Sequence, residues 1–169
     1  MTRKVLFVPS CVFCPSMQAK QSEQQEFEMQ RIRQFFLNID ANIITYQCPE
    51  ASFKGYEVGL KRLPRGIKYY QNLSGFNEHC LSLSKILAEQ IREFISCGYT
   101  VIAVIGIERS PTCAVSYMYT NEGTIHQKGI FINYLSKQLN KECIDISFVG
   151  INRNFPRKGL EEILKLLNE

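Results

Sequence analysis

The sequence lacks an apolar run of about 18 residues, the length that a membrane-spanning helix needs. It also lacks the apolar core and small-residue cleavage site of a secretory signal peptide, because its first apolar stretch, residues 5–8, is only as long as a strand. Repeats, low-complexity tracts and domain linkers are absent as well. We therefore expect a single cytoplasmic α/β domain over residues 1–169, with no membrane partner.

A strong excess of one charge is also lacking. The chain has 20 basic and 16 acidic residues, a net charge of +4, and they are spread along its length. Nucleic-acid-binding domains usually gather their basic residues into a patch, so we expect no stable nucleic-acid partner. The densest basic group consists of Lys61, Arg62, Arg65 and Lys68. It is either a solvated loop, which we favour, or a lip that attracts an anionic or nucleotide-like substrate.

Cysteine, in contrast, is abundant. Seven cysteines are more than a cytosolic chain of 169 residues needs, and their number is odd. Disulfide frameworks belong mainly to small secreted domains, so metal binding or catalysis explains these cysteines better.

The hydrophobic pattern alternates between strand-like and helix-like segments. It predicts strands at residues 5–8, 41–46, 101–107 and 144–149, and helices at residues 18–38, 78–97, 130–139 and 160–167. Gly98 stands where a glycine commonly ends a helix. Residues 49–76 are predicted to be a long irregular loop, and loops of this length in compact domains are usually functional or disordered.

Strands that alternate with helices imply crossover connections and a parallel sheet. We expect an α/β fold of three layers, helix–sheet–helix, with a mostly parallel, Rossmann-like sheet. Ligands of such sheets bind beyond the carboxyl ends of the strands, at a topological switch point.

Three cysteines follow the carboxyl ends of three predicted strands: Cys11, Cys48 and Cys113. If those strands are neighbours, about 4.8 Å apart at each step, the three loops converge at one edge of the sheet. Thiolates are soft ligands that suit iron–sulfur clusters, zinc or copper, and ligand type alone does not separate iron from zinc. Three thiolates on a four-iron cluster leave one iron without a protein ligand, as expected of a catalytic centre.

Two polar residues beside these cysteines are candidates for catalysis. Glu50, in the run Cys48-Pro49-Glu50, could act as a general acid or base. It could equally be a helix N-cap or a surface carboxylate. Ser110 could donate a hydrogen bond to a cluster sulfur or to substrate, or it could cap a helix that begins at Pro111.

The remaining candidates have weaker signals. Cys14 forms a C-x-x-C pair with Cys11, which could be a redox pair, or Cys14 could be a spare or fourth ligand. His79 is expected at the surface, and His126 is not expected to be a ligand. We expect the other cysteines to be buried or incidental: Cys80, Cys97 and Cys143. Candidates for pocket residues at strand ends are Arg109, Asn152 and Arg153.

The order and context of these motifs resemble the thiouracil desulfurase family, once catalogued as a domain of unknown function. The resemblance covers about residues 5–150. It is carried by Cys11 after the first strand, by Cys48-Pro49-Glu50 after the second and by Ser110-Pro111-Thr112-Cys113 after the third. Two further segments resemble the family, residues 59–65 and the glycine-led start of a helix at Gly129. The chain departs from the family pattern at Thr112, usually serine, and at Ala114, usually glycine.

The resemblance implies a 4Fe-4S cluster on Cys11, Cys48 and Cys113, and an enzyme of sulfur metabolism. The iron that has no protein ligand would take the sulfur of a small thiocarbonyl substrate such as a thiolated nucleobase. Glu50 and Ser110 would assist while water replaces that sulfur. Two alternatives remain open: a non-catalytic metal or sulfur carrier, and a thiol redox protein that uses Cys11 and Cys14. The sequence does not indicate an oligomeric state.

Overall fold

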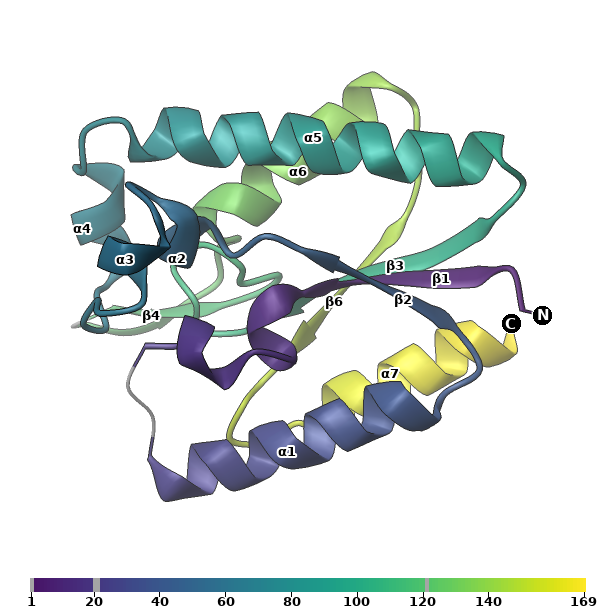
Figure 1. Ribbon diagram of the computed structural model, residues 1–169, viewed down its shortest axis with the longest axis horizontal. Coiled ribbons are helices and arrows are strands. Elements are labelled where there is room, and N and C mark those ends of the chain that lie inside the picture. The colour runs from purple at the N-terminus through teal and green to yellow at the C-terminus, as the bar shows by residue number, and fades with distance from the viewer. Residues whose placement is uncertain (1, 20–21, 121) are drawn as a thin grey trace.

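The computed structural model describes residues 2–19, 22–120 and 122–169. Within these ranges, one sheet consists of the parallel strands β1 (Lys4–Pro9), β2 (Asn42–Tyr46), β3 (Thr100–Ile107) and β6 (Ser147–Ile151). Their order across the sheet is β2-β1-β3-β6. Helices cover both faces of this sheet (Figure 1). The predicted three-layer α/β fold with a parallel, Rossmann-like sheet is confirmed.

Each face of the sheet has its own hydrophobic core. On one face, Leu6 and Val8 of β1 pack with the helices α1 (Glu23–Asn38) and α7 (Arg157–Asn168). On the other face, Val5 and Phe7 pack with α5 (Phe76–Ser96) and α6 (Ile130–Lys141). Successive side chains of a strand point to opposite faces, so a central strand covered on both sides is apolar throughout. In the described ranges, no helix has both the length and the apolar character of a membrane span.

Two helix ends have identifiable local causes. The first helix begins at Glu23 rather than at Gln18, because the Ser22 side chain caps it in a reciprocal capping box with Gln25. Residues 20 and 21 of the predicted helix lie outside the described residues. Helix α5 ends as predicted: Gly98 has φ +79°, and its N–H and that of Tyr99 donate to carbonyls of the last turn.

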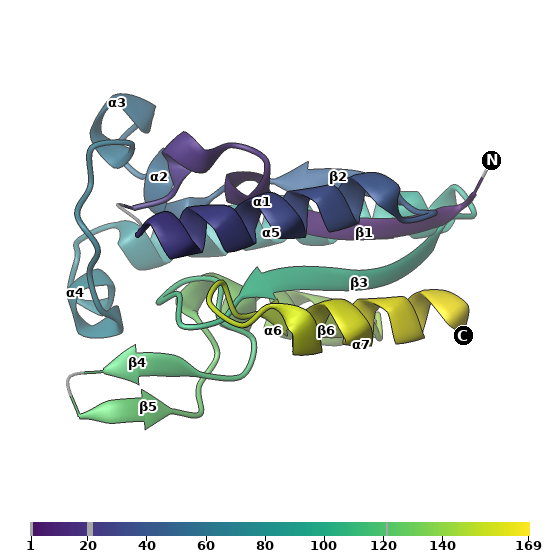
Figure 2. The same cartoon turned by 90° about the horizontal axis from the view of Figure 1, so that it is seen from below.

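The prediction of an irregular loop over residues 49–76 is wrong. This segment contains three short helices, α2 (Pro49–Ser52), α3 (Tyr56–Gly59) and α4 (Ile67–Gln71). The sequence pattern also missed two 3-10 turns and a small hairpin: η1 (Ser10–Val12), η2 (Pro15–Met17), β4 (Met118–Thr120) and β5 (Gly123–Ile125). Periodicity does not reveal elements this short, since they span about one helical turn or a few residues of strand. The three short helices and the hairpin lie at the carboxyl end of the sheet (Figure 2).

The connections place a topological switch point between β1 and β3. The chain passes from β1 to β2 through α1, on one face, and from β3 to β6 through α6, on the other face. The loops after β1 and β3 therefore diverge and leave a crevice where ligands of such sheets bind.

Candidate functional site

Three cysteines come together at the carboxyl edge of the sheet. Cys11 lies in η1, directly after β1, and Cys48 follows β2 as the N-cap residue of α2. Cys113 lies in the turn that follows β3. The strands β2, β1 and β3 are neighbours, so these loops meet, and all three cysteines line one cavity of about 160 Å³, here called the thiol cavity. This is the convergence that the sequence predicted.

The three thiols influence one another electrostatically. Burial raises the pKa of the Cys48 thiol to about 11, and the Glu50 carboxylate adds to the rise. Burial also raises the pKa of Cys11 and of Cys113 well above the ordinary thiol value, and in both cases the charge of Cys48 raises it further. At neutral pH the thiols of the metal-free protein are therefore protonated, and metal binding must release their protons.

A tight turn presents Cys113. The Ser110 hydroxyl accepts hydrogen bonds from the N–H groups of Thr112 (3.3 Å) and Cys113 (3.1 Å). The chain forms a turn here and not the helix that Ser110 would have capped. The first amides of α6 close the turn, because Ile130 N–H donates to Pro111 O (3.0 Å) and Phe131 N–H to Thr112 O (3.0 Å).

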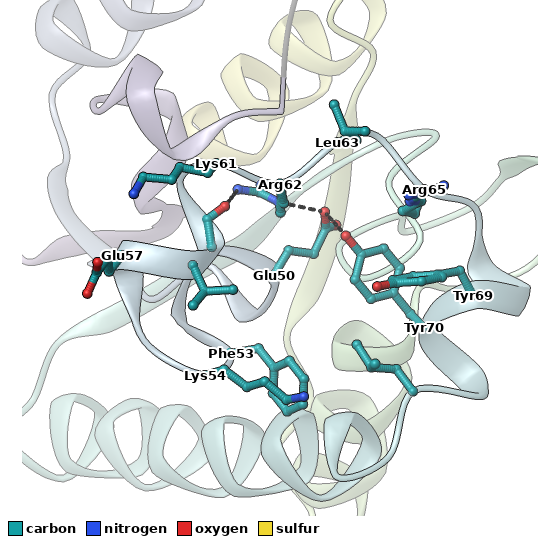
Figure 3. A pocket seen from close by; sticks show the side chains of 13 residues that line it. Glu50, Phe53, Lys54, Glu57, Lys61, Arg62, Leu63, Arg65, Tyr69 and Tyr70 are labelled. Carbon is teal, nitrogen blue, oxygen red and sulfur yellow. Dashed lines mark hydrogen bonds and ion pairs between the residues drawn. The ribbon is translucent and has the colours of Figure 1, made fainter.

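Glu50 lies between the hydroxyls of this turn and the segment that follows α3. Its Oε1 accepts from Ser110 Oγ (3.3 Å) and Thr112 Oγ1 (2.9 Å). Its Oε2 accepts from Tyr70 OH (3.1 Å) and Arg62 Nε (3.2 Å) (Figure 3). Only 12% of the Glu50 side chain is exposed, and the N-cap of α2 is Cys48. The interpretations of Glu50 as an N-cap or a surface carboxylate are therefore wrong.

Arg62 joins three segments around this carboxylate. Besides Glu50, its guanidinium donates to Gly59 O (2.8 Å) and to Met17 O (2.7 Å). The preference for a solvated loop is therefore wrong for Arg62, although Lys61, Arg65 and Lys68 are exposed.

The sequence did not reveal the partners of Glu50, which are Arg62, Tyr70 and Thr112. Thr112 could have been found from its motif beside Cys113, whereas no local signal marks Tyr70.

Two of the three predicted pocket residues line the thiol cavity: Arg109 and Arg153. Arg153 Nη1 donates to Gln18 Oε1 (3.2 Å), and Gln18 Nε2 donates to Cys11 O (2.6 Å), so this arginine supports the Cys11 turn. Asn152 instead donates to Tyr117 OH (2.6 Å) and lines a polar cavity that adjoins the thiol cavity at Arg109 and Arg153. With Arg62 and Arg65, which also line the thiol cavity, the guanidinium groups favour negative charge there.

The other cysteines lie outside this cavity. Cys80 lies on α5 and is fully buried in the core, and Cys97 and Cys143 are exposed. Cys14 is half-buried, its Sγ is 3.1 Å from Ser16 Oγ, and it is not among the residues that line the thiol cavity. None of the seven cysteines forms a disulfide.

The two histidines also lie outside the thiol cavity. His79, expected at the surface, is half-buried and shares a hydrogen bond with Ser52 Oγ (2.8 Å), and burial lowers its pKa. His126 is exposed.

The donor set can be compared with what a metal requires. Among the described residues, no group of three or more His, Cys, Asp or Glu side chains has the arrangement to hold a metal ion. A single zinc ion draws each thiolate to about 2.3 Å from one point. In a four-iron cluster each thiolate binds a different iron, so the ligands stand further apart. Three soft thiols that line one cavity and interact electrostatically are a donor set that suits such a cluster.

Comparisons of the chain with protein-family models, with curated proteins and with solved structures found no match.

Proposed function

We propose that the protein is an iron–sulfur-dependent desulfurase that removes sulfur from a small thiocarbonyl compound such as a thiolated nucleobase. The observation that carries the proposal is the thiol cavity itself. Cys11, Cys48 and Cys113 line it together with Glu50 and Ser110. Soft donors and a hydrogen-bonded carboxylate thus meet in one small space, at the edge of the sheet where ligands bind.

In this proposal the three cysteines hold a 4Fe-4S cluster. When bound in this way, the cluster supplies one iron with no protein ligand, a Lewis acid with affinity for sulfur. The arginines that line the cavity compensate the negative charge of the thiolates. The buried setting of Cys48 and Cys113 limits access of water and oxidants to their sulfur atoms.

The residues around Glu50 provide the proton chemistry. The overall reaction converts a thiocarbonyl and water into a carbonyl and hydrogen sulfide, with no net oxidation or reduction. Glu50 accepts one proton from the attacking water as the new carbon–oxygen bond forms. When the carbon–sulfur bond breaks, Glu50 returns this proton to the sulfur, the new hydroxyl group loses the second proton to the sulfur, and its oxygen becomes the carbonyl oxygen. The Thr112 and Ser110 hydroxyls donate to Oε1 of Glu50 and hold it in place, and Ser110 also lines the thiol cavity, where its hydroxyl would donate to the substrate if it turned away from Glu50.

The first experiment is visible absorption of protein purified without oxygen, with iron and sulfide counted. We expect a broad absorption band at about 400 nm and about four irons for each chain. Cys11→Ala, Cys48→Ala and Cys113→Ala should each lose iron, whereas Cys97→Ala and Cys143→Ala, at exposed positions outside the cavity, should keep it. A protein that stays colourless after anaerobic reconstitution would contradict the proposal. In that case, loss of thiol activity in Cys14→Ala would favour the redox alternative.

The second experiment separates an enzyme from a carrier. We expect the loaded protein to release sulfide from 2-thiouracil or a related thio-nucleobase. Glu50→Gln should retain its iron and lose turnover by about 100-fold or more. Glu89→Gln, at an exposed position on α5, is the matched control. A loaded protein that releases no sulfide from any thiocarbonyl compound would indicate a carrier, and full activity in Glu50→Gln would remove Glu50 from the mechanism.

A further inference from the structure

A second, larger cavity adjoins the thiol cavity. Its volume is about 550 Å³, and the segment of residues 50–73 forms its lining (Figure 3). Glu50, Arg62 and Arg65 line both cavities, so they form a shared wall. Binding sites for small molecules usually measure about 300–1,000 Å³. The thiol cavity is smaller than this, whereas the second cavity can hold the bulk of an organic molecule.

The wall of the second cavity has apolar side chains that face solvent. Val58, Leu63 and Tyr69 line it and are 58%, 61% and 47% exposed. Phe53 and Tyr70 add two more rings to the lining. Exposed apolar surface gathered in a concave site is typical of a place that a ligand covers.

The charges in this cavity favour an anion. Of the acidic residues in its lining, Glu50 is already paired with Arg62. The other charged residues of the lining are three cations, Lys54, Lys61 and Arg65, and one carboxylate, Glu57. Glu57 lies far from Arg65 and Tyr69 (Figure 3). The positive charge at the Arg65 end is therefore not offset by that carboxylate.

The cations are held beside aromatic rings. The Arg65 guanidinium lies 5.2 Å from the centre of the Tyr69 ring, and Lys54 Nζ lies 5.5 Å from the centre of the Phe53 ring. A guanidinium that stacks on a ring keeps its N–H donors at its edge, where they can bind a carboxylate or a phosphate through two hydrogen bonds. Each pair thus offers an apolar face and a cation side by side.

We propose that this second cavity binds the arm of an organic anion, an apolar or aromatic chain that ends in a carboxylate or a phosphate-type group, with Arg65 as the main cation. For the substrate, this inference rests on the proposed function. The thiocarbonyl head would occupy the thiol cavity, and the anionic arm would extend past Arg65 into the second cavity. The substrate class is then a thiocarbonyl compound that carries an oxyanion on an apolar arm.

The test uses sulfur-free probes, so that binding does not depend on turnover. Isothermal titration calorimetry on the anaerobically purified protein would compare 3-phenylpropionate, 3-phenylpropylphosphonate and the neutral 3-phenylpropanol. We expect at least one anion to bind about tenfold more tightly than the alcohol, and the two anions separate a carboxylate ligand from a phosphate-type ligand.

Three variants test the residues of the site. Arg65→Gln should remove the preference for the anion, and Tyr69→Leu should weaken the binding of all three probes. Lys68→Gln, a neighbouring exposed position that lines neither cavity, should change nothing. Equal binding of the alcohol and both acids, or an unchanged preference in Arg65→Gln, would overturn the assignment.

A second comparison separates this inference from the proposed function. If the protein desulfurates 2-thiouracil, a derivative with a carboxypropyl arm should have a KM lower by about tenfold, and Arg65→Gln should abolish the difference. Turnover with equal KM values for both compounds would refute the substrate class and leave the desulfurase intact. Arg65-dependent binding of the sulfur-free anions in a protein that desulfurates nothing would refute the desulfurase and leave the anion site intact.

Discussion

At Glu50, donors from three parts of the chain meet on one carboxylate. Ser110 and Thr112 bind Oε1 from the side of the cysteine turn, and Tyr70 and Arg62 bind Oε2 from the side of the larger cavity. Hydrogen bonds to a charged group contribute about 1.5–3 kcal/mol each, more than those between neutral groups. Both carboxylate oxygens are therefore fixed in direction, and Oε1 is the one bound to the turn that carries Cys113.

Thr112 supplies the shortest of these contacts, 2.9 Å, and its side chain is fully buried. Thr112→Val keeps the shape but removes the donor, so we expect the free energy of unfolding to fall by about 1–3 kcal/mol. Thr112→Ser keeps the hydroxyl and loses a methyl group, at a cost of about 1 kcal/mol. Urea unfolding measures both losses of stability. Turnover should be retained in Thr112→Ser, which keeps the hydroxyl, and should fall in Thr112→Val. If Thr112→Ser loses as much stability and turnover as Thr112→Val, the hydrogen bond to Glu50 does not explain the effect of Thr112→Val.

At the scale of elements, the start of α6 and the turn that carries Cys113 form one unit. A Cβ atom on Gly129 would overlap the backbone of Thr112, and a Cβ atom on Gly106 of β3 would overlap the carbonyl of Cys113. The buried Glu108 carboxylate continues this unit, because it accepts hydrogen bonds from the N–H groups of Val115, Ser116 and Tyr117. The position of the third thiol therefore depends on close packing of backbone against backbone.

Gly129→Ala tests this dependence. Gly129 has φ −62°, which alanine adopts without strain, so the added methyl group acts through overlap alone. We expect a loss of about 1–3 kcal/mol in the free energy of unfolding, together with a lower iron content. Gly66→Ala is the matched control, because Gly66 has φ −83° and no atom within 4 Å of an added Cβ. Equal stability and equal iron content in the two variants would show that the turn tolerates displacement.

For the whole molecule, the sheet order determines that the cysteines meet. Cys11 and Cys113 follow the two central strands, and Cys48 follows the edge strand beside them. Residues separated by about a hundred positions in the chain thus share one cavity. The convergence of the three loops also removes their thiols from water, and the stability of the fold is therefore coupled to the protonation of these thiols.

This coupling predicts that alkaline pH destabilises the metal-free protein. The pKa of Cys48 rises from 9.0 to about 11 on folding. The unfolded chain therefore loses this proton first, and stability falls as the pH rises from about 9 to about 11. The pKa shift of Cys48 corresponds to a loss of roughly 3 kcal/mol in the free energy of unfolding. Cys11 and Cys113 extend this loss of stability to higher pH, because burial raises their pKa further. Urea unfolding under reducing, oxygen-free conditions at pH 8, 9 and 10 measures the slope. Cys48→Ala should have a shallower slope, and identical slopes would contradict the prediction.

The sequence by itself determined the elements with strong periodicity and the residues that share one sheet edge. The apolar strands and the long amphipathic helices were found because burial on one or both faces leaves a periodic pattern in a single segment. The end of α5 at Gly98 was found because a left-handed residue there favours glycine. Cys11, Cys48 and Cys113 were found together because the carboxyl ends of parallel strands lie at one edge, whatever separates them in the chain.

The tertiary structure alone decided which groups surround those residues. The short helices of residues 49–76 leave no periodic signal, because each spans only about one helical turn. The contacts of Tyr70 and Arg62 with Glu50 and the cavity beside Arg65 leave none either, because they depend on how this segment folds back on itself. Ser110 followed by Pro111 has the local signature of a helix start, but the start of α6 takes up the carbonyls of Pro111 and Thr112 and holds the segment as a turn. Sequence patterns record how each segment is buried, whereas the partners of a polar side chain depend on which distant segment packs against it.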